Sequence, residues 1–98
     1  MTTAALIERI RGRADAIRGA GVTGMYIFGS RARGDARAES DLDAFVDIDP
    51  SRKFSLIDLV SIEDLLECEL GLPVDLTTRN SLNPHLRARV EAEAIRVI

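Results

Sequence analysis

The apolar positions in the first third of the chain predict a helix followed by a strand. Between residues 3 and 19, apolar side chains recur at spacings of three and four, at Leu6, Ile10, Ala14 and Ile17. This spacing is typical of an amphipathic helix, whose charged residues lie on the other faces. The run from Val22 to Phe28 is rich in β-branched and aromatic residues and stops at Gly29, so it predicts a strand that ends in a turn.

The middle of the chain predicts a second strand and a second helix. Leu42 to Ile48 resumes the apolar strand pattern, and Asp49-Pro50 closes it as a turn. Ser55, with an acid three residues later at Asp58, has the spacing of a helix N-cap. The helix that it begins carries a row of apolar residues, Leu59, Ile62, Leu66 and Leu70.

The last third predicts one more strand and one more helix. Leu72 to Thr77 has the composition of a short strand, and Asn83-Pro84 has that of a helix start, an N-cap followed by proline at the first helical position. Apolar residues then follow on one side, at Leu86, Val90, Ala94 and Val97. The order αββαβα predicts one α+β domain over residues 1–98, with helices layered on a small sheet.

Composition and charge narrow the class of protein. A chain of 98 residues has room for one core and one site. The net charge of −3 argues against a dedicated nucleic-acid binder but leaves a small phosphorylated ligand open. Cys68 is the only cysteine, no segment resembles a signal peptide, and no run of about 20 apolar residues could span a membrane. A cytoplasmic protein is expected.

A polar segment, Ser30 to Ser40, is the longest interruption of the apolar pattern, and its start has the chemistry of an anion site. Gly29 lets the backbone turn sharply at the strand end and lets a ligand approach closely, because it has no side chain. Ser30 begins a short helical turn, whose free N–H groups and hydroxyl would receive phosphate oxygens.

Two acids at the start of the second strand suggest a metal site. Asp41 and Asp43 are two residues apart, so their carboxylates leave the same face of a strand, with Cα atoms roughly 6.5–7 Å apart. Asp75 would join them if its strand lies beside Leu42–Ile48. Three crowded acids repel one another unless cations lie between them, as in two-metal phosphoryl transfer. From the residues alone, Asp41 and Asp43 could instead mark an exposed strand end. Asp75 could instead cap a strand or pair with an arginine.

Three arginines in the polar segment could meet a triphosphate. Arg31, Arg33 and Arg37 lie between the proposed anion site and the acids, where they could neutralise phosphate charge or pair with the acids. Arg33 is predicted to contact the nucleotide, and Arg37 to be solvated.

Four other conspicuous side chains are predicted to have no chemical role. Tyr26 and Phe28 alternate on one face of the first strand and are expected in the core. Asp47 is expected to mark the end of the second strand, and His85 to lie on the surface or to cap the last helix.

These motifs together resemble the polymerase-beta-like nucleotidyltransferase superfamily. The resemblance rests on Gly29-Ser30, on Asp41-x-Asp43 after ten further residues, and on the later strand residue Asp75. The form GSRARG at residues 29–34 is similar to that of the smallest branch, the minimal nucleotidyltransferases (MNT) found beside HEPN-domain partners in prokaryotic toxin and antitoxin pairs. The resemblance covers essentially the whole chain and implies a mixed sheet flanked by helices, the palm of that superfamily.

The resemblance also implies an activity, the transfer of a nucleoside monophosphate, usually AMP from ATP, to a hydroxyl. It implies that two Mg²⁺ ions are bound by the catalytic residues Asp41, Asp43 and Asp75. The nucleotide is expected on Gly29, Ser30 and Arg33. Some such enzymes are antitoxins that adenylylate a HEPN toxin, which makes such a toxin the expected partner.

Two alternatives differ from this activity in what the chain does. One is an antitoxin that acts by binding alone, without catalysis. The other is the nucleotide-binding subunit of a two-chain enzyme that modifies a small molecule such as an aminoglycoside. The oligomeric state is open.

Overall fold

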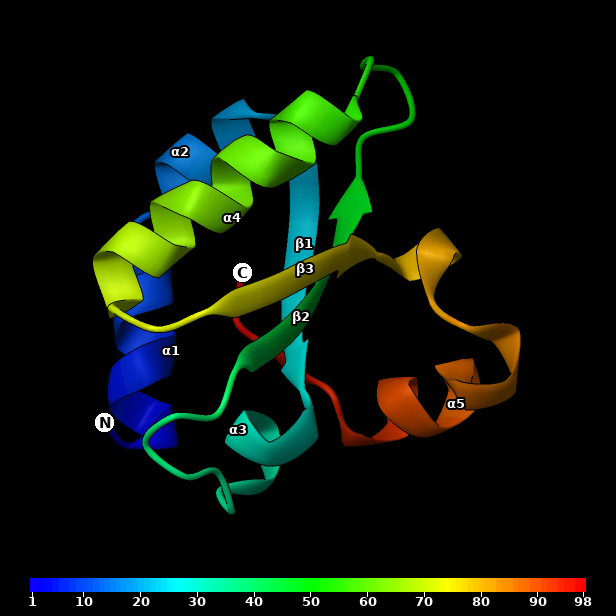
Figure 1. Cartoon of the computed structure of the whole chain (residues 1–98). Helices are drawn as coiled ribbons and strands as arrows, with labels where there is room; N and C mark the ends of the chain where they lie inside the picture. The colour runs from blue at the N-terminus through cyan, green and yellow to red at the C-terminus, as the bar shows by residue number, and fades with distance from the viewer.

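A computed structural model describes residues 1–98, and its centre is one mixed sheet (Figure 1). The four strands are β1 (Val22–Phe28), β2 (Leu42–Ile48), β3 (Val74–Thr78) and β4 (Ile95–Arg96). Their order across the sheet is β3-β2-β1-β4. β1 runs antiparallel to β2 and β4, whereas β3 runs parallel to β2. The predicted mixed sheet is therefore confirmed.

Helices cover one face of this sheet and one of its ends. The helical elements are α1 (Thr3–Arg11), α2 (Ala14–Gly19), α3 (Gly29–Arg33), α4 (Leu56–Leu70), α5 (Pro84–Glu93) and the 3-10 turn η1 (Arg79–Ser81). In Figure 1, α1, α2 and α4 lie together on one side of the strands, and α3 and α5 lie at the end where β1 finishes. The predicted α+β class with two layers is confirmed. No helix is long and apolar enough to cross a membrane.

Strand alternation divides the sheet into an apolar face and a polar one. Met25 and Ile27 of β1 are fully buried, and they belong to the core together with Leu42, Ala44 and Val46 of β2 and Leu66 of α4. The intervening residues, among them Asp43, Phe45 and Asp75, point to the opposite face because successive side chains alternate. This second face, called the open face below, has no helical layer over it and carries the polar chemistry.

α4 also protects the outer edge of the sheet. The predicted N-cap is present, since the side chains of Ser55 and Asp58 each accept a hydrogen bond from the other's backbone N–H. On the sheet side, Glu67 accepts from the Val74 N–H at 2.9 Å and Glu63 accepts from the Leu76 N–H at 3.1 Å. The edge strand β3 therefore has these two N–H groups satisfied, which lowers its tendency to pair with another chain.

The first predicted helix is interrupted. α1 ends at Arg11, Gly12 caps it, and α2 begins at Ala14, so the spacing of apolar residues continues across a break. Glycine in a helix interior costs about 1 kcal/mol relative to alanine, which favours a break at Gly12. Leu6, Ile10 and Ile17 still reach the same core.

The prediction that the last helix includes Ala94 and Val97 is wrong. α5 ends at Glu93, and Ala94 takes an extended conformation. The chain then runs along the free edge of β1, where the N–H groups of Val97 and Ile98 donate to the Met25 carbonyl at 2.8 and 3.2 Å. The β-branched residues of this segment suit a strand, and the unpaired edge of β1 offered hydrogen bonds that a helix would have left unused. The predicted order αββαβα therefore omits β4, the fourth strand of the sheet.

Arg79, just after β3, holds the open face together. Its Nε and Nη2 donate to Asp47 at 2.7 and 2.9 Å, and it also pairs with Glu91 of α5. Its guanidinium carbon lies 4.9 Å from the ring centre of Tyr26 and 4.8 Å from that of Phe45. The hydrogen bond to Asp47 raises the pKa of Arg79 above its ordinary value. Asp47 is thus an ion-pair partner and more than a strand end.

The prediction that Tyr26 and Phe28 belong to the core is also wrong. Both are half-buried and lie on the open face, outside the core cluster. Tyr26 stacks on Phe45 with ring centres 4.9 Å apart, and Phe28 is tilted against Phe45 at 5.9 Å. The rings of Tyr26, Phe45 and Phe28 therefore form a row on the open face, and the Arg79 guanidinium lies over Tyr26 and Phe45.

Candidate functional site

The sheet register brings the predicted acids to one end of the open face. Asp43 of β2 is the register partner of Asp75 of β3, so their Cα atoms lie about 4.8 Å apart, the separation of neighbouring strands. Asp41 lies immediately before β2 and is exposed, as is Asp75. The strand pairing on which the position of Asp75 depended is present.

Asp43 is the acid most affected by its surroundings. Partial burial raises its pKa, and the charges of Asp75 and Asp41 raise it further, whereas Arg33 lowers it. Asp43 accepts no hydrogen bond within the chain. The three carboxylates therefore repel one another, and Arg33 is the only cation of the protein that opposes their effect on Asp43.

The donor chemistry of this cluster fits a hard divalent cation. Mg²⁺ prefers carboxylate oxygens, often one or two from the protein together with substrate phosphates. Burial and then the neighbouring acids raise the pKa of Asp43, so its charged form is disfavoured as the side chains stand. As the side chains stand, no group of three His, Cys, Asp or Glu residues converges on a single point where a metal ion could be held. The residues fit the ion in kind, and closing around it requires side-chain rotation.

Gly29 stands directly against Asp43. Its φ of +72° lies in the left-handed region, and a Cβ placed on it would be 2.6 Å from Asp43 Oδ2. Phe28 directly precedes Gly29 at the end of β1 and is the register partner of Asp43. Its side chain makes no capping hydrogen bond to α3. Any other residue at position 29 would displace the carboxylate, so glycine is needed here for two separate reasons.

The side chain of Glu93 occupies the predicted phosphate position. Its Oε1 accepts a hydrogen bond from the Gly29 N–H at 2.9 Å, and its Oε2 accepts from Arg33 Nη1 at 3.3 Å. Arg33 is also paired with Asp35, and this bond is the main reason that the pKa of Arg33 is raised. A backbone N–H and a guanidinium are groups that bind phosphate oxygens as well as carboxylates. The Ser30 hydroxyl makes no hydrogen bond within the chain.

The three arginines of the polar segment differ in their roles. Arg31 is only 7% exposed, and its Nη2 donates to the carbonyls of Ala38 and Ser40 at 3.2 and 2.8 Å. It therefore fixes the loop that leads to Asp41. Arg33 faces the cluster, and Arg37 is exposed, as predicted. The roles of Arg79 and Glu93 depend on contacts between distant parts of the chain, so no local pattern of residues indicates them.

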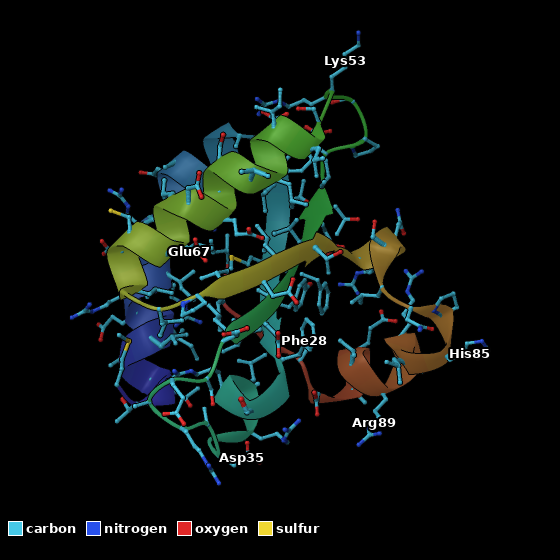
Figure 2. The ribbon with its side chains drawn as sticks, viewed as in Figure 1. Phe28, Asp35, Lys53, Glu67, His85 and Arg89 are labelled. Carbon is cyan, nitrogen blue, oxygen red and sulfur yellow. The ribbon has the colours of Figure 1, made fainter.

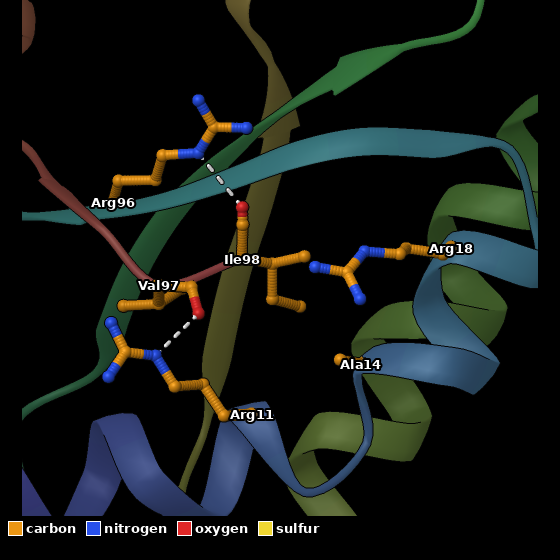
Figure 3. A pocket seen from close by; sticks show the side chains of 6 residues that line it. All are labelled: Arg11, Ala14, Arg18, Arg96, Val97 and Ile98. Carbon is orange, nitrogen blue, oxygen red and sulfur yellow. Dashed lines mark hydrogen bonds between the residues drawn. The ribbon is translucent and has the colours of Figure 1, made fainter.

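The largest cavity of the protein is elsewhere. It measures about 560 Å³ and lies between Arg11, Arg18 and Arg96 (Figure 3). Arg11 donates to the Val97 carbonyl at 3.1 Å, and Arg96 donates to that of Ile98 at 2.9 Å. None of the predicted site residues lines it. A smaller cavity of about 210 Å³ does adjoin Gly29, Arg33 and Asp43.

Comparison with known sequences identifies similar proteins. Residues 7–97 match the family model described as nucleotidyltransferase domain. The chain is 41% identical over 78 residues to a protein of Methanocaldococcus jannaschii named as a candidate protein adenylyltransferase, covering 80% of this chain and 82% of that protein. It is 38% identical over 77 residues to the protein adenylyltransferase MntA of Thermococcus cleftensis, covering 79% and 76% of the two chains.

Solved structures share the fold. A candidate minimal nucleotidyltransferase superimposes with a TM-score of 0.73 at 36% identity, over 97% of this chain and 95% of the other. A toxin–antitoxin whose crystal structure was determined with AMP-PNP gives a TM-score of 0.72 at 21% identity, over 90% and 72% of the two chains. At that identity the second likeness concerns the fold alone.

We expect Gly29→Ala to destabilise the protein more than Gly71→Ala. Both glycines have similar positive φ angles, +72° and +69°, so alanine costs roughly 1–2 kcal/mol at either position. Only at position 29 does the new Cβ meet another group, the Asp43 carboxylate. Urea unfolding of the two variants measures the difference. Equal losses would mean that Asp43 moves aside without cost.

We expect Asp43→Asn to stabilise the protein at pH 7. Because the pKa of Asp43 is higher in the folded than in the unfolded state, the folded state binds more protons between those values, and stability falls as pH rises through the interval. The charged carboxylate therefore lowers stability at pH 7. The Tm gain over the wild type should disappear below pH 3.9, the approximate unfolded pKa of Asp.

The matched control is Asp64→Asn, since Asp64 is exposed on α4 and makes no ion pair. Its Tm should equal that of the wild type at both pH values. A lower Tm for Asp43→Asn at pH 7 would show that the carboxylate is stabilised by contacts other than those described.

Proposed function

The chain belongs to the nucleotidyltransferase domain family, and we propose that it transfers AMP from ATP to a hydroxyl group of a partner protein. Membership and an enzyme of this class were both expected from Gly29-Ser30 and Asp41-x-Asp43, and the family match confirms them. The donor, the metal ions and the acceptor are the parts that we propose.

One observation carries the proposal, the meeting of an anion site and an acid cluster. Gly29 lies at the end of β1 with Asp43 immediately beside it, and Asp43 is in register with Asp75. An anion site and a cation site are useful side by side when a ligand carries both phosphate and metal. A nucleoside triphosphate with Mg²⁺ is such a ligand.

The residues around Gly29 would hold the triphosphate. The Gly29 N–H, the Ser30 hydroxyl and the Arg33 guanidinium donate hydrogen bonds to phosphate oxygens and hold the phosphorus in line with the acceptor. The acceptor oxygen forms a bond to the α-phosphorus, the bond between that phosphorus and the bridging oxygen to the β-phosphate breaks, and pyrophosphate leaves. The Asp75 carboxylate accepts the proton of the hydroxyl.

Asp41, Asp43 and Asp75 would hold two Mg²⁺ ions. When bound, these ions supply positive charge to the phosphate oxygens and lower the pKa of the attacking hydroxyl. Burial raises the pKa of Asp43, and repulsion by Asp75 and Asp41 raises it further. A cation would relieve that repulsion, which supports this role.

Relatives and shape support a protein acceptor. The similar sequences are named as protein adenylyltransferases or as candidates for that activity. We propose a HEPN-domain toxin as the partner and a tyrosine hydroxyl as the acceptor. The open face is suited to this arrangement, because Asp41 and Asp75 are exposed on it and no second layer of the chain closes over them.

An assay with labelled ATP, Mg²⁺ and the protein encoded by the neighbouring gene tests the proposal. Label should pass to the partner protein, and Asp43→Asn should reduce the rate by roughly 10²-fold or more, as the loss of a group that stabilises the transition state does. Asp64→Asn is again the control and should retain the wild-type rate.

The two alternatives give different results in the same experiment. Full neutralisation of the toxin by the double variant Asp41→Asn, Asp43→Asn would favour an antitoxin that acts by binding alone. Transfer of label to an aminoglycoside, and none to the protein, would favour the two-chain small-molecule enzyme.

We also expect Glu93→Gln to tighten the binding of inorganic tripolyphosphate. The Glu93 carboxylate bonds to Gly29 and Arg33, two of the groups that would hold the phosphates, so a phosphate must displace it. Glutamine keeps an acceptor for the Gly29 N–H but removes the charge. Calorimetry should give a dissociation constant lower by roughly ten-fold, the value of one charge-assisted hydrogen bond.

Asp64→Asn is the matched control. Asp64 is exposed on α4 and makes no ion pair, so this variant changes the net charge by the same amount without touching the phosphate groups. If both variants raise the affinity equally, the effect comes from net charge and not from displacement of Glu93.

A further inference from the structure

A cavity of about 210 Å³ lies between α5 and the end of β1. Four of its lining residues belong to the candidate site, namely Gly29, Arg33, Asp43 and Glu93. A ligand whose phosphates lie on Gly29 would therefore extend directly into this cavity.

The other walls of the cavity come from α5 and from β1. Phe28 contributes an aromatic ring from the end of β1, and Leu86 and Val90 contribute apolar side chains from α5. Leu86 is 50% exposed although it is apolar, and α5 has no buried residue. Arg89 completes the lining and makes no hydrogen bond or ion pair within the chain. Figure 2 shows Phe28 and Arg89 on these two elements.

Its size and lining suit one part of a nucleotide. Pockets for whole small molecules measure about 300–1,000 Å³ and combine apolar walls with a few polar groups. A cavity of about 210 Å³ is smaller, so it suits a ring system whose charged portion remains outside. The walls are an aromatic ring and two aliphatic side chains, which is the environment in which a nucleobase stacks.

We propose that this cavity, walled by Phe28, Leu86 and Val90, binds the nucleoside of the donor and separates its base from water. The inference rests on the proposed function, because it takes the phosphates to lie on Gly29 and Arg33. Phe28 stacks on the base, Leu86 and Val90 cover its other side, and the unpaired Arg89 lies at the rim within reach of the ribose or of base oxygen and nitrogen atoms.

The experiment compares ATP with tripolyphosphate, which shares the phosphates but has no nucleoside. Calorimetry in the presence of Mg²⁺ gives the dissociation constants of both ligands for the wild type and for Leu86→Ala and Phe28→Leu. In both variants the constant for ATP should rise about five-fold or more, since stacking of one base contributes about 1–3 kcal/mol, while that for tripolyphosphate stays unchanged.

Leu56→Ala is the matched control, because Leu56 is an exposed leucine of α4, 74% accessible and far from the cavity. It should leave both constants at the wild-type values. In the wild type, adenine protons should show nuclear Overhauser contacts to the Leu86 and Val90 methyl groups.

Four outcomes would overturn the inference. Unchanged ATP binding in both variants, or equal loss of ATP and tripolyphosphate binding, would mean that the cavity does not hold the nucleoside. A higher KM for the protein acceptor at unchanged ATP affinity would assign the cavity to the acceptor side chain and leave the proposed function standing. Failure of the wild type to bind either ligand would overturn both the inference and the proposed function.

Discussion

The space between Gly29 and Asp43 is the constraint on which the site depends. Gly29 leaves space for the Asp43 carboxylate, because a Cβ placed on residue 29 would lie only 2.6 Å from Asp43 Oδ2. This contact follows from the antiparallel register that pairs Phe28 with Asp43, and the parallel register on the other side of β2 adds Asp75. A shift of either pairing by one residue would turn Asp43 or Asp75 into the apolar core. The core that fixes the register therefore also fixes the chemistry.

Much of this could be predicted from the sequence because its determinants are local. The spacing of apolar residues gave β1, β2 and α4, the Ser55 and Asp58 pair marked a helix start, and Gly29 with Asp41-x-Asp43 marked the site. The end of the chain could not be predicted in this way. Residues 94–98 continue a helical spacing, but pairing with the free edge of β1 outweighs it, and that edge exists only in the folded sheet.

Sequence reasoning missed the structural roles of two arginines, Arg79 and Arg31. Arg79 joins Asp47 of β2 to Glu91 of α5 while stacking on Tyr26 and Phe45, and so it fixes α5 relative to the sheet. Arg31 was considered as a phosphate ligand, but its burial and its bonds to loop carbonyls make it a support for the segment before Asp41. Arg79 has no local motif because its partners lie on other elements, whereas Arg31 bonds to loop carbonyls only seven and nine residues away.

The candidate site makes contacts within the chain that a ligand would replace. Burial and then repulsion by the neighbouring acids raise the pKa of Asp43, so part of the folding free energy is lost to keep its charged carboxylate in this position. The cationic side is already satisfied, since Glu93 bonds to Gly29 and Arg33. A metal-bound triphosphate would relieve the repulsion at Asp43 but would have to displace Glu93 from Gly29 and Arg33. Its net affinity is therefore the gain from the first change minus the cost of the second. That cost depends on α5, which carries Glu93 and is fixed by Arg79.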